Sequence, residues 1–281
     1  MDIPSYSIVA LFLLVLATGC SVLPGATSTR TTATTTTLPV SAGSATVPTP
    51  ESANTEPTKV AIFQDQSGSI DKTRTPQLKT EDLTPLFGLL PQGGGELAFG
   101  CICDRSNRSL IRVRIEQPPV PPAKPPEFSA EEGNPFAAAE KRNEYESKAV
   151  AHQKALADYN QRQQLWRNQS EQQLKQFKAA IAPILNQPAN CQATDIWGGV
   201  QRADLFLNES DTTWSRPPRK IAIFISDGID NVKTPAVAMK TNAKVIVVNG
   251  SASLGSFSSL NPMQFESPTA AFSYVASSRG K

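Results

Sequence analysis

Three short runs of apolar, mostly β-branched residues constrain the fold of this chain most strongly. They occupy residues 59–65, 220–227 and 244–249, and each passes from a lysine into apolar residues without polar alternation. Uninterrupted runs of this length are typical of parallel strands that are covered on both faces. Because helical sequence separates them, we predict an α/β fold with a doubly wound, mostly parallel sheet.

Two further runs predict an antiparallel hairpin at the edge of this sheet. Residues 97–103 are mostly apolar, and a short polar connection leads to residues 110–116. In the second run apolar residues alternate with charged ones, namely Ile111, Val113 and Ile115 with Arg112, Arg114 and Glu116. Alternation indicates a strand with one face in water. After residue 249 only a serine-rich loop and one helix near 268–277 follow, so we expect five strands.

A long insertion separates the hairpin from the second half of the sheet. It covers residues 118–182, beginning with a proline tract that should be extended and stiff. Residues 135–182 are rich in Ala, Gln, Glu and Lys and predict one long helix or two. Two interpretations stay open. The helix packs its C-terminal third on the domain and projects the rest, or it binds a partner.

The N-terminal residues predict export and lipid anchoring. The apolar run at 8–16 is about half of the ~20 residues that span a bilayer, which suits the core of a signal peptide over residues 1–19. The sequence before Cys20 resembles the bacterial lipobox, which implies lipidation of Cys20 and a membrane anchor. Residues 20–58, rich in Thr, Ser and Pro, predict a disordered tether, so the folded domain should occupy 59–281. Ser21 after the cysteine favours the outer membrane or cell surface.

Composition excludes several function classes. A net charge of +2 without a basic tract argues against nucleic acid as a partner. His152 is the single histidine of the sequence, so Ser-His or Cys-His catalysis and histidine-rich zinc sites are poorly supported.

In an oxidising compartment a disulfide from Cys101 or Cys103 to Cys191 is favoured, and Cys103–Cys191 is our candidate pair. Cys101 and Cys103 point to the same side of a strand, a poor geometry for bonding each other.

The residues that carry chemistry follow the apolar strands. The first strand leads into an Asp-x-Ser-x-Ser arrangement, and the strand at 220–227 ends in Ser-Asp-Gly. Between them, a Thr-Asp pair opens a helix. Loops at the carboxyl ends of parallel strands meet at one edge of the sheet, where ligands bind in open α/β folds. The candidate site residues are Asp65, Ser67, Ser69, Thr194 and Asp227.

This arrangement resembles the metal-ion-dependent adhesion site of von Willebrand factor A domains. The resemblance covers residues 59–281, with the long helical stretch as an insertion. It implies that Ser67 and Ser69 ligate the metal directly, and that Thr194 does so directly or through water. It also implies that Asp65 and Asp227 act largely through bridging water. The family's sheet usually has six strands and includes one antiparallel edge strand.

Hydroxyl and carboxylate oxygens select a hard divalent cation, Mg²⁺ first, with Mn²⁺ or Ca²⁺ as alternatives. Two carboxylates roughly balance the ion's charge, so the ion can accept one more anionic oxygen. A Glu or Asp side chain of a partner protein would supply it. Because this is binding without a general base, we expect a lipid-anchored binding protein and not an enzyme.

The same residues allow other interpretations. Phosphatases of the haloacid dehalogenase type need a second Asp two positions after the first, where Ser67 stands here. Asp195 is expected to support the start of the following helix and Asp230 the loop after Asp227. The alternative function is a structural or assembly factor of the cell envelope that acts through the long helix.

Overall fold

A computed structural model describes residues 56–68, 75–106, 108–125, 127, 135–210, 213–232, 234–250 and 253–278. The predicted signal peptide, nearly all of the predicted tether, the lipidation site at Cys20, and Ser69 lie outside these ranges.

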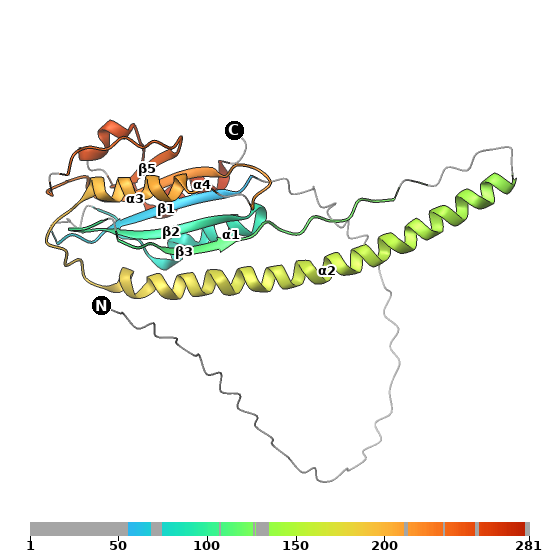
Figure 1. Ribbon diagram of the computed structural model, residues 1–281. Coiled ribbons are helices and arrows are strands. Elements are labelled where there is room, and N and C mark those ends of the chain that lie inside the picture. The colour runs from blue at the N-terminus through green and yellow to red at the C-terminus, as the bar shows by residue number, and fades with distance from the viewer. Residues whose placement is uncertain are drawn as a thin grey trace, which may run out of the picture. The chain divides into compact units, whose positions relative to one another are not determined.

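Six strands form one sheet in the order β3-β2-β1-β4-β5-β6 (Figure 1). β2 and β3 are antiparallel, and every other neighbouring pair is parallel. The sheet is therefore mostly parallel with one antiparallel edge strand, as predicted. The strands are β1 (Thr58–Asp65), β2 (Gly95–Ile102), β3 (Ile111–Ile115), β4 (Arg219–Ile225), β5 (Lys244–Val248) and β6 (Met263–Phe265).

The expectation of five strands is wrong, because β6 pairs in parallel with β5. β6 has three residues, of which Met263 and Gln264 are exposed. Its place in the sheet depends on backbone pairing and not on burial, so no apolar run in the sequence indicated it.

Helices cover both faces of the sheet. α1 (Thr84–Gly93), α4 (Pro268–Ser277) and the C-terminal part of α2 (Pro135–Asn186) share one hydrophobic core with one face. α3 (Ile196–Asn208) and the 3-10 helix η2 (Gly255–Leu260) pack in a second core on the other face. A second short 3-10 helix, η1 (Thr80–Leu83), precedes α1. β1 supplies both cores, because Val60 and Ile62 face the first while Ala61 and Phe63 face the second.

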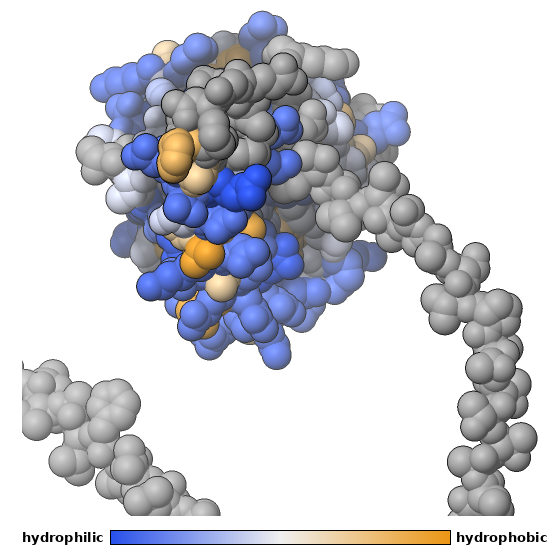
Figure 2. All heavy atoms as spheres, turned by 90° about the vertical axis from the view of Figure 1, so that its right-hand side faces the viewer, coloured by the Kyte–Doolittle hydropathy of each residue, from blue (hydrophilic) through white to orange (hydrophobic). Residues whose placement is uncertain are grey.

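The predicted helical insertion is one continuous helix of 52 residues, about 78 Å long at ~1.5 Å per residue. Its hydrophobic residues that pack on the core all lie at Trp166 or later in the chain. The indole of Trp166 also donates a hydrogen bond to the carbonyl of Glu116 (3.0 Å). The earlier part of α2 extends beyond the sheet (Figure 1), and Figure 2 shows that side of the molecule as mainly hydrophilic. Among the described helices none combines the length and apolar character that crossing a membrane requires.

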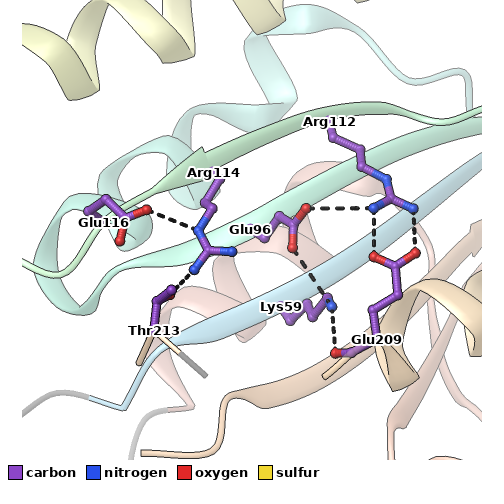
Figure 3. A network of polar contacts seen from close by, with 7 residues as sticks. All are labelled: Lys59, Glu96, Arg112, Arg114, Glu116, Glu209 and Thr213. Carbon is purple, nitrogen blue, oxygen red and sulfur yellow. Dashed lines mark hydrogen bonds and ion pairs between the residues drawn. The ribbon is translucent and has the colours of Figure 1, made fainter. Parts of the chain in front are cut away.

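A charge network around the buried Lys59 joins three strands to the end of α3 (Figure 3). Lys59 is 1% exposed, and its Nζ lies 3.7 Å from Glu96 Oε2 and donates to the carbonyl of Glu209 (3.2 Å). The ring of Phe206 lies 4.6 Å from the same ammonium. Arg112 binds the carboxylate of Glu209 through both terminal nitrogens, at 2.6 and 2.7 Å. Burial raises the pKa of Glu96, while Lys59 and Arg112 oppose that rise.

Candidate functional site

The site is built around Asp65, the last residue of β1, whose side chain is fully buried. Its Oδ1 accepts a hydrogen bond from the backbone N–H of Ser67 (2.8 Å), and its Oδ2 accepts one from the hydroxyl of Ser226 (2.7 Å). Both carboxylate oxygens are therefore held in place from different loops. The role of Ser226 was not predicted, although β1 and β4 are neighbours and Ser226 directly follows β4.

The electrostatics at Asp65 combine burial, hydrogen bonds and a neighbouring carboxylate. Burial raises the pKa of the Asp65 carboxyl, the hydrogen bonds from Ser67 and Ser226 lower it, and the nearby charge of Asp227 raises it again. Within the described part of the chain, neither carboxylate forms an ion pair. A divalent cation between them would replace repulsion with attraction, which suits this donor set.

Glycine fixes the loop that carries Asp227. Gly228 has φ +81°, and a Cβ added there would lie 2.6 Å from the carbonyl oxygen of Leu254. Its N–H donates to the hydroxyl of Ser226 (3.1 Å), while Asp227 Oδ1 accepts from the N–H of Ile229 (3.0 Å). The turn after β4 therefore requires a residue without a side chain next to Asp227.

Thr194 is buried and attached to the same loop. Its N–H donates to Asn231 Oδ1 (2.6 Å), and its carbonyl accepts from the N–H of Asn231 (3.2 Å). Asn231 therefore determines how the backbone of Thr194 lies relative to Asp227, a role that was not predicted from the sequence.

The predicted role of Asp195 is confirmed, because its carboxylate caps α3 by accepting from Gly198 N–H (2.9 Å). Asp230 accepts both from Val232 N–H and from Ile196 N–H, both at 3.1 Å.

A disulfide ties the Thr194 loop to the other loops. Cys103, which follows β2, is bonded to Cys191, with a Cα–Cα distance of 5.3 Å. The N–H of Cys191 donates to the carbonyl of Gln66 (3.1 Å), and its own carbonyl accepts from Gly68 N–H (2.8 Å). Cys101 is a free thiol. Cys103 and Cys191 also lie close to Asp104, but their sulfurs are bonded to each other and this group is not a clear cation site.

Four of the five predicted site residues therefore belong to loops that hydrogen bonds and a disulfide join at the carboxyl ends of β1 and β4. They are Asp65, Ser67, Thr194 and Asp227, whereas Ser69 lies outside the described residues. The side-chain oxygens of such residues are hard donors suited to a divalent cation. His152, the one histidine of the sequence, lies on α2 ahead of Trp166.

Comparisons with known proteins leave the family open. A scan against protein-family models finds no match, and a search of curated proteins finds none. Among solved structures, the chain is similar to the pilus adhesin SpaC from Lactobacillus rhamnosus GG in its open conformation, with 13% identity and a TM-score of 0.29. The match covers 63% of this chain and 15% of the adhesin. The structure itself defines a mixed α/β protein with a six-stranded, mostly parallel sheet and one long helix.

Proposed function

We propose that this protein binds a divalent cation, Mg²⁺ foremost, and uses it to bind a partner protein. The cation accepts a Glu or Asp carboxylate of that partner as its remaining ligand, and no chemical reaction follows. The residues that hold the cation, directly or through water, are Asp65, Ser67, Ser69, Thr194 and Asp227.

One observation carries this proposal: the fully buried carboxylate of Asp65 is held by Ser67 and by Ser226, the residue next to Asp227, whose charge acts on it unfavourably. Two anionic groups held together this way repel each other unless a cation lies between them. Neutral hydroxyl donors do not add further negative charge, so the bound ion remains attractive to an outside carboxylate. The result is a docking point for an acidic side chain.

The resemblance to von Willebrand factor A domains supports the same conclusion. It rests on the order of the Asp-x-Ser-x-Ser, Thr and Asp-Gly elements along the chain. A six-stranded sheet with one antiparallel edge strand is also what that resemblance implies. The long helix α2 is then an insertion ahead of the Thr194 loop.

Calorimetric titration of the full chain with Mn²⁺ tests the cation site. The Asp65→Asn substitution keeps the shape of the side chain and removes its charge, so Mn²⁺ affinity should fall at least tenfold. Asp158→Asn on the exposed part of α2 makes the same change of charge elsewhere and should leave affinity unaltered. Equal affinity in the wild type and in Asp65→Asn would disprove the proposal.

Partner binding is tested with proteins extracted from the cell envelope. Immobilised wild-type chain should retain a partner in Mg²⁺ and release it in EDTA, and Asp65→Asn should retain it in neither buffer. Retention that survives both EDTA and the substitution would show that the cation does not mediate docking.

We also propose that the protein is exported and lipid-anchored through Cys20. The disulfide between Cys103 and Cys191 suits an oxidising compartment outside the cytoplasm. Metabolic labelling with an alkyne analogue of palmitate should mark the wild type and not Cys20→Ser. Equal labelling of both would exclude Cys20 as the anchor.

α2 favours a second candidate function, that of an assembly factor. No described side chain of α2 before Trp166 belongs to the hydrophobic core, and this part carries exposed apolar residues such as Phe136 (87% exposed) and Val150 (67%). In this alternative, partner binding depends on that part of α2, and Asp65→Asn leaves it unchanged.

A further inference from the structure

A cavity of ≈ 310 Å³ lies next to the disulfide and borders the candidate site at Gln66, although none of the proposed cation ligands lines it. The end of β2, the loop after it and the segment after α2 enclose it. Its floor is apolar: Phe99 belongs to the hydrophobic core, and Ile111 and Ile184 pack against that core. The volume lies within the range of about 300–1,000 Å³ that is usual for small-ligand sites.

The rim of the cavity is cationic. Arg105 and Arg108 line it, and the lining residues include no carboxylate. Arg108 lies 3.9 Å from Asp104, an exposed pair that constrains the guanidinium little. The amides of Gln66, Gln187 and Asn190 complete the polar part of the lining.

We propose that this cavity binds a ligand in which a carboxylate is joined to an apolar group about as large as a phenylalanine side chain. The apolar group packs against the partly exposed Ile111 and Ile184, and the carboxylate meets Arg105 and Arg108. A guanidinium presents two parallel N–H donors that match the two oxygens of a carboxylate, so arginine selects this headgroup over a neutral amide.

The free thiol of Cys101 supports an apolar floor. Cys101 lines the cavity, and burial raises the pKa of its thiol to about 11. Two ligand sources share the proposed chemistry: a small free acid, and the C-terminal residue of a peptide. Both place one carboxylate beside one apolar group.

The test uses N-acetyl-4-fluorophenylalanine as the probe and its primary amide as the matched neutral compound. Binding to the full chain is followed by broadening of the ¹⁹F signal, in EDTA so that the cation site plays no part. We expect the acid to bind at least tenfold more tightly than the amide. Saturating acid should also slow methylthiolation of Cys101 at pH 9, in a Cys20→Ser background, which places the probe in this cavity.

A double substitution tests the cationic rim. Arg105 and Arg108 are exposed, so Arg105→Gln with Arg108→Gln should preserve the fold and weaken binding of the acid at least tenfold. Arg142→Gln with Arg162→Gln on α2 removes the same charge elsewhere and should leave binding unchanged. Three outcomes would overturn the proposal. The first is no binding of the acid at ~10 mM, far weaker than a ligand site of this size usually shows. The others are equal binding of acid and amide, and equal loss of binding in both double variants.

A further comparison separates the two sources. A pentapeptide that ends in 4-fluorophenylalanine and 3-(4-fluorophenyl)propionate are titrated in the same way. Tighter binding of the peptide assigns the cavity to a peptide C-terminus, and tighter binding of the propionate assigns it to a free acid. If neither binds, the proposed ligand class is wrong.

Discussion

Lys59 and Asp65 stand near opposite ends of β1, and both are withdrawn from water. The charge of Lys59 is compensated within the protein, by the carboxylate of Glu96 and the carbonyl of Glu209. Among the described residues, Asp65 receives hydrogen bonds from the neutral groups of Ser67 and Ser226 and lies near a second carboxylate, Asp227. Burying a charge has the same physical cost at both ends of the strand. At one end an ionic network compensates it, and at the other end lies the candidate site.

At the residue scale, the Lys59 network should be important for stability. Glu96→Gln leaves a buried ammonium with one ionic partner fewer and should lower the free energy of unfolding by about 3 kcal/mol. Adding Lys59→Met to that variant removes the uncompensated charge and should restore much of the loss. Urea denaturation at pH 7 measures both, and Glu144→Gln, on the surface of α2, should have no effect. A double variant no more stable than Glu96→Gln would contradict this account.

Cys101 gives a prediction on pH. Because burial raises the pKa of this thiol to about 11, the folded protein keeps it protonated at pH 8. In the unfolded chain the pKa of the thiol is ~8.5, so the thiol is partly ionised at that pH. Alkylation by iodoacetamide should be about 100-fold slower in the folded chain than in urea, and its rate should rise until roughly pH 11. A Cys20→Ser background isolates this thiol. A rate that reaches its plateau near pH 8.5 in the folded protein would show that the thiol is not shielded.

The sequence predicted where the candidate residues lie but not the hydrogen bonds that support them. Asp65, Ser67, Thr194 and Asp227 each follow a recognisable apolar strand or open a helix, so their position at one sheet edge could be inferred. Ser226 and Asn231 act through hydrogen bonds between loops that are distant in sequence. Such partners depend on the three-dimensional path of each loop, which local sequence does not determine.

At the element scale, burial explains which parts of the fold were predictable. β1, β4 and β5 are buried along most of their length and produce apolar runs, and the alternation in β3 matches one covered face. β6 and α1 were not predicted. β6 is too short for a pattern, and α1 is interrupted by Gly88 and Pro91, which are poor helix formers.

The disulfide connects elements that the sheet alone does not join. It closes a loop with a sequence separation of 88 residues, which includes all of α2, and chain entropy predicts about 4.6 kcal/mol of stabilisation. Replacing Cys103 and Cys191 together by Ser should therefore lower the urea midpoint. It should also weaken Mn²⁺ binding several-fold, because Thr194 loses the attachment of its loop. Cys101→Ser is the control and should leave Mn²⁺ affinity unchanged, and unaltered affinity in the double variant would show that hydrogen bonds alone hold the loop.

At the scale of the whole molecule, the candidate site and the extended part of α2 lie at opposite ends of the sheet. Ile115 near the end of β3 pairs with Gly95 at the start of β2, so the chain leaves the sheet at the amino ends of the parallel strands. Trp166 contacts Glu116 at that end, while α2 finishes near Cys191 beside the site. A partner held by the cation would therefore not need the extension, and a partner held by the extension would not need the cation.

This separation predicts that the extension can be removed without unfolding the domain. The hydrogen bond between Trp166 and Glu116 shows that the two ends of the segment 119–162 approach each other, so a linker of about six Gly and Ser residues should span them. Because no described residue of this segment belongs to either hydrophobic core, its excision should change the free energy of unfolding by less than about 1 kcal/mol. Phe177→Ala, in the packed part of the same helix, should cost about 3–5 kcal/mol in parallel urea titrations. If the excised chain loses as much stability as Phe177→Ala, the extension is part of the fold. If the excised chain keeps its stability and its Mn²⁺ affinity but no longer binds the envelope partner, the partner docks on α2 and not on the cation.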